Sequence, residues 1–243
     1  MKNFCRGVGL FLLVILAVSC ATAKAYEVSW PEAQSILGGK KAVVLNYGMA
    51  ERALAKSGGA WIAGILTLPV GGLFYITLPE VLSNAQFNNY ARRISQDVET
   101  LQNEQRPILT GSLTEAYTET FNAEVVNADY PFDSTKVTLN YFTRPNDQTK
   151  ETIASICSDN DAEFVVAPVA QIITEGRGGA YTRKTDVHVS IAIFDKAGNL
   201  VATGNAQTVN AEISLNPQSQ VGDLRNLFTS VGGNVSELIR SLR

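Results

Sequence analysis

The segment from Ser57 to Pro79 contains no charged residue, and it limits the folds that are open to this chain. As one straight helix its 23 residues would measure about 34 Å, enough for the ~30 Å hydrocarbon core of a bilayer. Pro69, Gly71 and Gly72 interrupt it, however, and in a helix they cost about as much free energy as the apolar side chains gain on insertion. The sequence therefore favours two short apolar halves joined as a hairpin over a single span.

This hairpin has two possible environments. It can pack under the protein's own sheet, or it can face lipid or a partner. Trp61 and Tyr75 are aromatic types that are enriched at membrane–water interfaces, and a large exposed apolar patch on a soluble monomer commonly marks an interaction site. The sequence favours contact with a membrane or partner through the large side chains of the stretch, which are Trp61, Ile62, Ile65, Leu66, Leu68, Val70, Leu73, Phe74, Tyr75 and Ile76.

Residues 1–19 have the layout of a secretory signal peptide. Two basic residues precede an apolar run from Val8 to Val18, which is too short to cross a bilayer. The run ends in Ala17-Val18-Ser19-Cys20, which resembles the lipobox of bacterial lipoproteins, with Ala17 where that family prefers Leu. The resemblance implies that Cys20 becomes the lipidated first residue. Cleavage after Ala23-Lys24-Ala25 would instead release a soluble protein that begins at Tyr26. We expect lipidation at Cys20.

Composition fits an exported single domain. Without the two basic residues of the signal peptide, 20 − 2 = 18 basic residues face 23 acidic ones. This negative balance argues against nucleic-acid binding, which depends on Lys and Arg neutralising phosphates. With Cys5 in the signal peptide and Cys20 lipidated, Cys157 is the remaining thiol, so we expect no internal disulfide.

Hydrophobic periodicity predicts the order of helices and strands. Strands are expected over residues 40–48, 163–174, 186–194 and 200–209, and helices over 83–106, 112–122, 147–161 and 223–242. Pro107 is expected to end the first of these helices, and Ser112 with Glu115 to form a capping box for the second. Residues 176–184 are expected to form a flexible loop. The order predicts an α/β fold with a single mixed β-sheet and flanking helices.

The predicted organisation has three parts. Residues 1–19 are the signal peptide, and residues 20–39 are a lipidated linker with a short helix. An α/β envelope domain follows over residues 40–243, with the apolar segment 51–82 inserted into it.

Part of the second half resembles a known family. The block "SDNDAEFVVAPVAQI" followed by "VHVSIAIFDKAGNLVATGNA" is similar to one in bacterial envelope lipoproteins, which include the penicillin-binding-protein activator lipoproteins, the curli-secretion lipoprotein and the TolB amino-terminal domain. In these proteins a helix leads into a strand and then into a hairpin whose turn carries an Asp and a Gly. The resemblance is best over residues 161–206 and implies an α/β domain. Because the 51–82 segment departs from the pattern, the partners of those relatives do not carry over.

The sequence contains few groups that could carry out catalysis. His188, the single histidine, lies in an alternating strand without a recognisable nucleophile and acid beside it. One His and one internal Cys cannot complete a zinc set, and "KSGGAWIAG" lacks the residue order of a phosphate-binding loop. Asp195 is expected to accept hydrogen bonds from backbone amides in a turn. We therefore expect no catalytic residue, metal or cofactor.

These features predict a non-enzymatic lipoprotein of the bacterial cell envelope. We expect Cys20 to anchor it in the outer membrane, facing the periplasm, where it binds a protein or lipid partner. Ala21, rather than Asp, after the cysteine is consistent with outer-membrane sorting in such lipoproteins. The alternative is a subunit of an oligomeric membrane assembly or secretion pore that inserts through residues 57–79. We expect an envelope protein as the partner and no binding to nucleic acid. The sequence is also compatible with a homo-oligomer.

Overall fold

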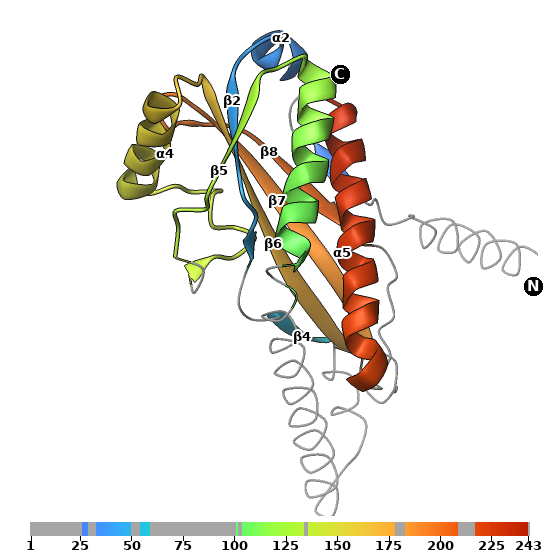
Figure 1. The fold of residues 1–243 in the computed structure, drawn as a ribbon. Helices are drawn as coiled ribbons and strands as arrows, with labels where there is room; N and C mark the ends of the chain where they lie inside the picture. Colours follow the sequence, from blue (N-terminus) through green and yellow to red (C-terminus); the bar gives the residue numbers. More distant parts are fainter. Residues whose placement is uncertain are drawn as a thin grey trace, which may run out of the picture.

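The chain forms one mixed β-sheet with helices on both faces (Figure 1), which confirms the predicted α/β fold. The computed structural model describes residues 26–28, 33–49, 54–58, 101, 104–133, 136–177, 183–208 and 217–242. Six strands follow one another across the sheet in the order β1-β8-β7-β6-β2-β5, and the short strands β3 and β4 pair with β6 beyond β2.

The strands are β1 (Tyr26–Val28), β2 (Ala42–Leu45), β3 (Gly48–Met49), β4 (Leu54–Gly58), β5 (Val125–Ala128), β6 (Phe164–Arg177), β7 (Arg183–Asp195) and β8 (Leu200–Gln207). The helices are α2 (Ala33–Leu37), α4 (Asp147–Asp159), α5 (Pro217–Arg240) and a helix over residues 104–121. Strands β6, β7 and β8 are antiparallel neighbours. Strands β2, β3 and β4 run parallel to β6 along its other side, and β5 runs parallel to β2.

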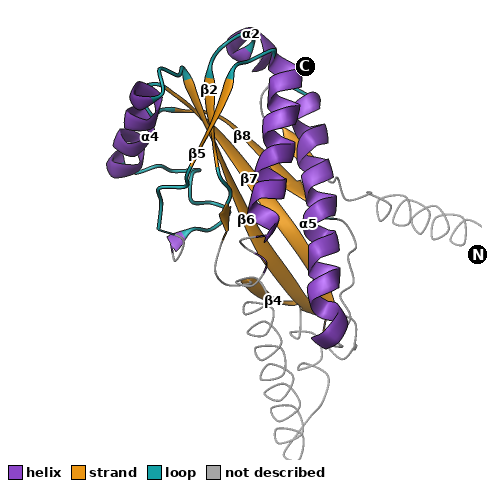
Figure 2. Cartoon of the chain, viewed as in Figure 1, coloured by secondary structure: helices purple, strands orange, loops and turns teal. Residues whose placement is uncertain are grey.

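The 104–121 helix and α5 lie side by side on one face of the sheet, which we call the two-helix face (Figure 2). Alternate residues of β7 are buried on this face, as their period of two predicts: Val187, Val189, Ile191 and Ile193. Helix α5 buries residues at the predicted spacing of three and four, namely Leu224, Phe228, Val231, Val235 and Leu238. The aliphatic core of the protein lies between these helices and the sheet.

The opposite face, which we call the aromatic face, is covered differently. Helix α4 packs against it through Ile153 and Cys157, as predicted, with Ile156 partly buried. Beside α4, residues 129–142 bring several rings onto β7. Their centroids lie 4.9–6.3 Å apart, and this aromatic cluster consists of Tyr130, Phe132, Tyr141, Phe142 and Phe194. No periodic pattern in the sequence predicted residues 129–142 as part of the core.

The helix over residues 104–121 contradicts the predicted break at Pro107. The helix passes through Pro107 and Ser112 without interruption. Ser112 is inside it, where its hydroxyl donates to the carbonyl of Ile108 at 3.1 Å, so the predicted capping box is wrong. Burial explains the difference, because core packing along the helix outweighs the local preferences of a proline and a serine. The packed residues include Leu109, Leu113, Ala116, Tyr117 and Phe121.

Strand pairing also extends beyond the predicted bounds. Strand β1 lies in the predicted linker and pairs with β8, so the folded unit begins before Lys40. Strand β4 lies in the predicted 51–82 insertion, so Ser57 and Gly58, at the start of the apolar stretch, belong to the sheet. Strands β6 and β7 reach Arg177 and Arg183, which leaves only residues 178–182 of the predicted loop between them. Pairing along a long strand satisfies backbone groups whatever the hydrophobic pattern.

Candidate functional site

The structure brings several chain segments to one end of the sheet, which we call the β4 end. Here β4 finishes at Gly58, level with Arg177 at the end of β6, and β7 begins at Arg183 opposite Gly176. Helix α5 begins at the same end, next to β4 in Figure 1. Because β1 is antiparallel to β8, its amino end also points toward the β4 end. The amino end of β1 and the carboxyl end of β4 therefore point toward the same end of the sheet.

The predicted site residues themselves lie outside the described residues. These are the lipidation residue Cys20 and the ten contact residues Trp61, Ile62, Ile65, Leu66, Leu68, Val70, Leu73, Phe74, Tyr75 and Ile76. What the structure adds is the position of the two strands that flank them. None of the helices in the described part of the chain is long and apolar enough to cross a membrane.

The turn between β7 and β8 confirms the structural role predicted for Asp195. Its Oδ1 accepts hydrogen bonds from the backbone N–H groups of Ala197 and Asn199, both at 2.9 Å. Gly198 has a φ of +75°, and a Cβ added there would lie 2.3 Å from the carbonyl oxygen of Lys150 in α4. The turn therefore packs directly against α4, and Asp195 holds its backbone in place.

His188 lies in a polar area of the aromatic face. The strand register places it in one row with Gln171 and Gln207, and Ser190 and Asn205 form the next row. Asp186, His188 and Ser190 follow at every second residue of β7, so successive Cα atoms lie about 7 Å apart.

Cys157 is the free thiol among the described residues, and it is buried in α4. Burial, together with the nearby charge of Asp195, raises the pKa of Cys157 to about 11. A thiol with so high a pKa is almost entirely protonated at neutral pH and therefore a poor nucleophile. In the described ranges, no group of three or more His, Cys, Asp or Glu residues could hold a metal ion.

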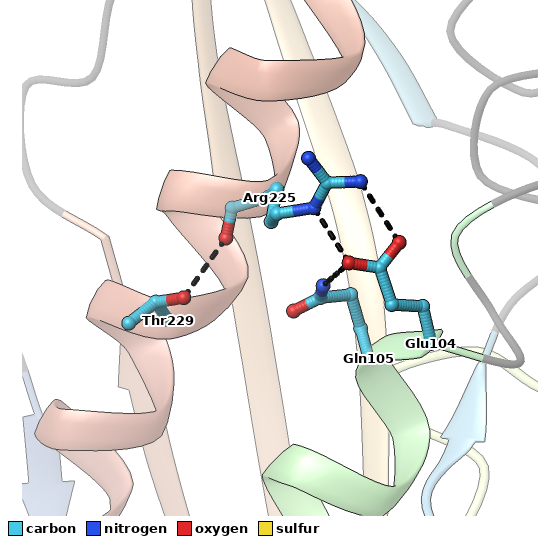
Figure 3. Close-up of polar contacts among 4 residues, drawn as sticks. All are labelled: Glu104, Gln105, Arg225 and Thr229. Carbon is cyan, nitrogen blue, oxygen red and sulfur yellow. Dashed lines mark hydrogen bonds and ion pairs between the residues drawn. The ribbon is translucent and has the colours of Figure 1, made fainter.

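Ion pairs join the two long helices at their exposed rims (Figure 3). Arg225 donates from Nε and Nη2 to the two carboxylate oxygens of Glu104 at 2.6 and 2.9 Å, and Gln105 donates to the same carboxylate at 3.3 Å. The hydrogen bonds from Arg225 lower the pKa of Glu104, and the same contact raises the pKa of Arg225. Arg240 pairs with Glu119 at 3.2 Å. Both pairs join residues 121 positions apart, so the helices run parallel.

A second polar group lies where β2 and β5 end. The parallel pairing of these strands finishes at Leu45 and Ala128. Directly afterwards the side-chain amide of Asn46 donates to Asp129 at 2.9 Å, and the Tyr47 N–H donates to the hydroxyl of Thr110 at 3.4 Å. Tyr130 packs against Gly48, next to Tyr47, and Arg106 lies one helical turn before Thr110. Sequence reasoning missed this group because its residues come from three separate segments and form no motif.

Comparison with known proteins gives distant likenesses only. No protein-family model and no curated protein matches the chain. Among solved structures, the PelC dodecamer from Paraburkholderia phytofirmans is similar with a TM-score of 0.40 and 9% identity, over 89% of this chain and 95% of that chain. The hypothetical protein CT253 from Chlamydia trachomatis is similar with a TM-score of 0.34 and 12% identity, over 84% of this chain and 99% of that chain. Likenesses this distant carry no argument about function.

Proposed function

We propose that this protein is a non-enzymatic lipoprotein of the bacterial cell envelope. Cys20 anchors it to the periplasmic face of the outer membrane, and the apolar stretch that follows β4 contacts the membrane or an envelope protein. The observation that carries this proposal is the shared direction of β1 and β4. The amino end of β1, which follows Cys20 in the sequence, and the carboxyl end of β4, which precedes the apolar stretch, both point toward the β4 end.

The distances along the sheet support a common membrane-facing end. Tyr26 is level with Ala170, and Gly58 is level with Arg177, seven residues further along β6. Seven residues of strand measure about 23 Å. Six residue steps separate Tyr26 from Cys20, and they span at most about 20 Å when extended. A lipid on Cys20 can therefore reach nearly to the level of Gly58, where the apolar stretch begins.

The lipid anchor is tested on the protein purified from membranes. We expect the intact mass of a chain that begins at Cys20 and carries two or three acyl groups, and we expect this protein in the outer-membrane fraction. The Cys20→Ser variant should lose the acyl mass and leave that fraction. A wild-type protein that begins at Tyr26 and is recovered in the soluble fraction would overturn both the anchor and the localisation.

The contact surface is tested by replacing residues 59–79 with a short Gly/Ser linker in the Cys20→Ser chain. Ser57 and Gly58 are kept because they belong to β4. We expect a cooperative thermal melt close to that of the unreplaced Cys20→Ser chain, but loss of binding to vesicles or to proteins captured from native membranes. An unfolded product would make the stretch part of the core. Gel filtration in detergent would distinguish a 26.2 kDa protomer from an oligomeric assembly.

A further inference from the structure

Arg106 carries a positive charge that the described protein leaves without a counter-charge. No carboxylate of the described residues forms an ion pair with it, whereas Arg225 and Arg240 on the neighbouring helix each pair with a glutamate. The Arg106 side chain is half-buried, and its Nε atom is buried without a hydrogen-bond partner. A buried donor on a charged group is costly to leave unpaired. An acceptor that binds the Arg106 Nε–H would therefore stabilise the protein.

Tyr130 supplies a second unused donor in the same place. Its hydroxyl is buried and has no hydrogen-bond partner. The ring is held by the edges of Phe132 and Phe142, with centroids at 5.4 and 6.3 Å, and it lies against Gly48, where an added Cβ would be 2.2 Å from a ring carbon.

Arg106 lies one helical turn before Thr110, whose hydroxyl accepts from the Tyr47 N–H beside Gly48. These contacts bring Arg106 to the same end of β2 as Tyr130. Burial raises the pKa of Tyr130, and the charge of Arg106 acts in the opposite direction.

The location of this pair is one where α/β proteins bind ligands. In open sheets with parallel strands, ligands bind outside the carboxyl ends of the strands, and Tyr130 follows the carboxyl end of β5 by two residues. Asp129, directly before Tyr130, is the acidic residue nearest to the tyrosine in the sequence, and its carboxylate accepts a hydrogen bond from Asn46. The described part of the chain thus supplies two buried donors here and no carboxylate paired with Arg106.

We propose that Arg106 and Tyr130 form a binding site for a single oxyanion group, a carboxylate or a phosphate, at the carboxyl ends of β2 and β5. The planar guanidinium offers a fork of donors that fits both groups, and the tyrosine hydroxyl adds a directed donor. Gly48 is part of the site because only a glycine leaves room for the Tyr130 ring. This site is separate from the β4 end. A negative result in the test of oxyanion binding would therefore not affect the lipoprotein proposal.

The test measures thermal melting of the full chain, purified in detergent, with sodium acetate or sodium phosphate as the probe. Sodium chloride keeps the ionic strength equal in all samples. We expect a saturable rise of the melting temperature with at least one probe. At ten times the dissociation constant, the folded state gains a factor of 11, which corresponds to about 3–6 °C for a chain of this length. The probe with the lower saturating concentration identifies carboxylate or phosphate as the preferred group.

Variants decide whether the rise belongs to this site. Arg106→Gln should abolish it and Tyr130→Phe should weaken it. Arg240→Gln should leave it unchanged, because Arg240 pairs with Glu119, which lies 13 residues, or about 20 Å, beyond Arg106 along the 104–121 helix. An equal rise in the Arg106→Gln protein, or no rise in the wild type with either probe up to 100 mM, would overturn the proposal. If Arg106→Gln does not fold, the Nε–H resonance of Arg106 in the wild type must shift on titration with the probe, and an unmoved resonance overturns the proposal.

Discussion

The two faces of the sheet are built from alternate residues of the same strands, but they are covered in different ways. On the two-helix face, two parallel helices bury a mainly aliphatic core, with a few aromatic residues such as Tyr117, Phe121 and Phe228, along the length of β7 and β8. On the aromatic face, one short helix and residues 129–142 cover the part of the sheet near the Asp195 turn, and a polar area that contains His188 adjoins it. One face is continuous packing, whereas the other combines packing with polar surface.

This difference indicates where function resides. A face that two helices bury from end to end contributes stability and leaves little surface for a ligand. The candidate sites lie instead where strands end, at the β4 end and at the carboxyl ends of β2 and β5. Substitutions on the two-helix face should therefore change stability, and the first prediction tests this.

The largest effect is expected for Phe228→Ala in α5. Phe228 is 1% exposed in the aliphatic core, and removing a buried phenylalanine side chain costs roughly 3–5 kcal/mol of unfolding free energy. Chemical denaturation of the purified protein measures this cost. Ile108→Ala, on the neighbouring helix, is the control, since Ile108 is 49% exposed and its truncation should cost little. Equal costs for the two substitutions would contradict the described packing of the two-helix face.

Gly198→Ala should be the most damaging small substitution on the aromatic face. A methyl group at Gly198 would meet the backbone of Lys150 in α4, and the residue would also have to keep its positive φ. We expect a loss of roughly 2–4 kcal/mol. Gly39 is a matched control, because its φ is +68° and no atom lies within 4 Å of an added Cβ. Gly39→Ala should show only the conformational cost, about 1–2 kcal/mol. A smaller loss at Gly198 than at Gly39 would argue against contact between the turn and α4.

The two faces also differ in how well the sequence predicts them. The alternation in β7 and the three-and-four spacing in α5 identify the residues of the two-helix face, because one repeating pattern per element is enough. Tyr130, Phe132 and Phe142 follow no pattern, since their burial depends on a loop folding back over β7. Pro107 misled the prediction for a similar reason, as tertiary packing outweighs the local preference of the residue.

The candidate sites show the same limit. The sequence alone indicates Cys20 and the apolar stretch, but only the strand register shows that the flanking ends of β1 and β4 point toward one end of the sheet. Arg106 and Tyr130 are 24 positions apart and belong to no motif. Their shared lack of partners becomes visible only when burial and hydrogen bonds are known.

Gly233→Ala should stabilise the two-helix face. The sequence predicts that Gly232 and Gly233 weaken α5, yet the helix continues through both. Nothing lies within 4 Å of a Cβ added at Gly233, so alanine there should add up to about 1 kcal/mol of stability. At Gly232 an added Cβ meets Leu109 of the neighbouring helix at 3.4 Å. Gly232→Ala should therefore gain less, and thermal melts measure both gains. Equal gains at the two positions would argue against this contact between the helices.

His188→Ala should have a small effect on stability and none on membrane binding. His188 is half-buried in the polar area of the aromatic face, and substitutions outside a packed core usually change stability by less than about 1 kcal/mol. The checks are a thermal melt and complementation of a deletion strain. If the variant folds normally but does not complement the deletion strain, His188 has a role in function. That result would support an enzymatic activity on the aromatic face.

The smallest effect is expected for Glu104→Gln at the rim of the two-helix face. The side chains of Glu104 and Arg225 are 45% and 49% exposed, so water and salt screen their attraction. Because the Arg225 contact lowers the pKa of Glu104 in the folded state, the pair stabilises the protein above the ordinary glutamate pKa. That contribution is lost as the pH falls through the lowered value.

The melting temperatures of wild type and Glu104→Gln should thus differ slightly at pH 7 in low salt and converge at pH 3 or in 1 M NaCl. Glu119→Gln, which removes the exposed pair with Arg240, is the matched control and should also change the melting temperature only slightly at pH 7. A large loss at Glu104 that persists at low pH would mean that the rim, and not the aliphatic core, holds the two helices together.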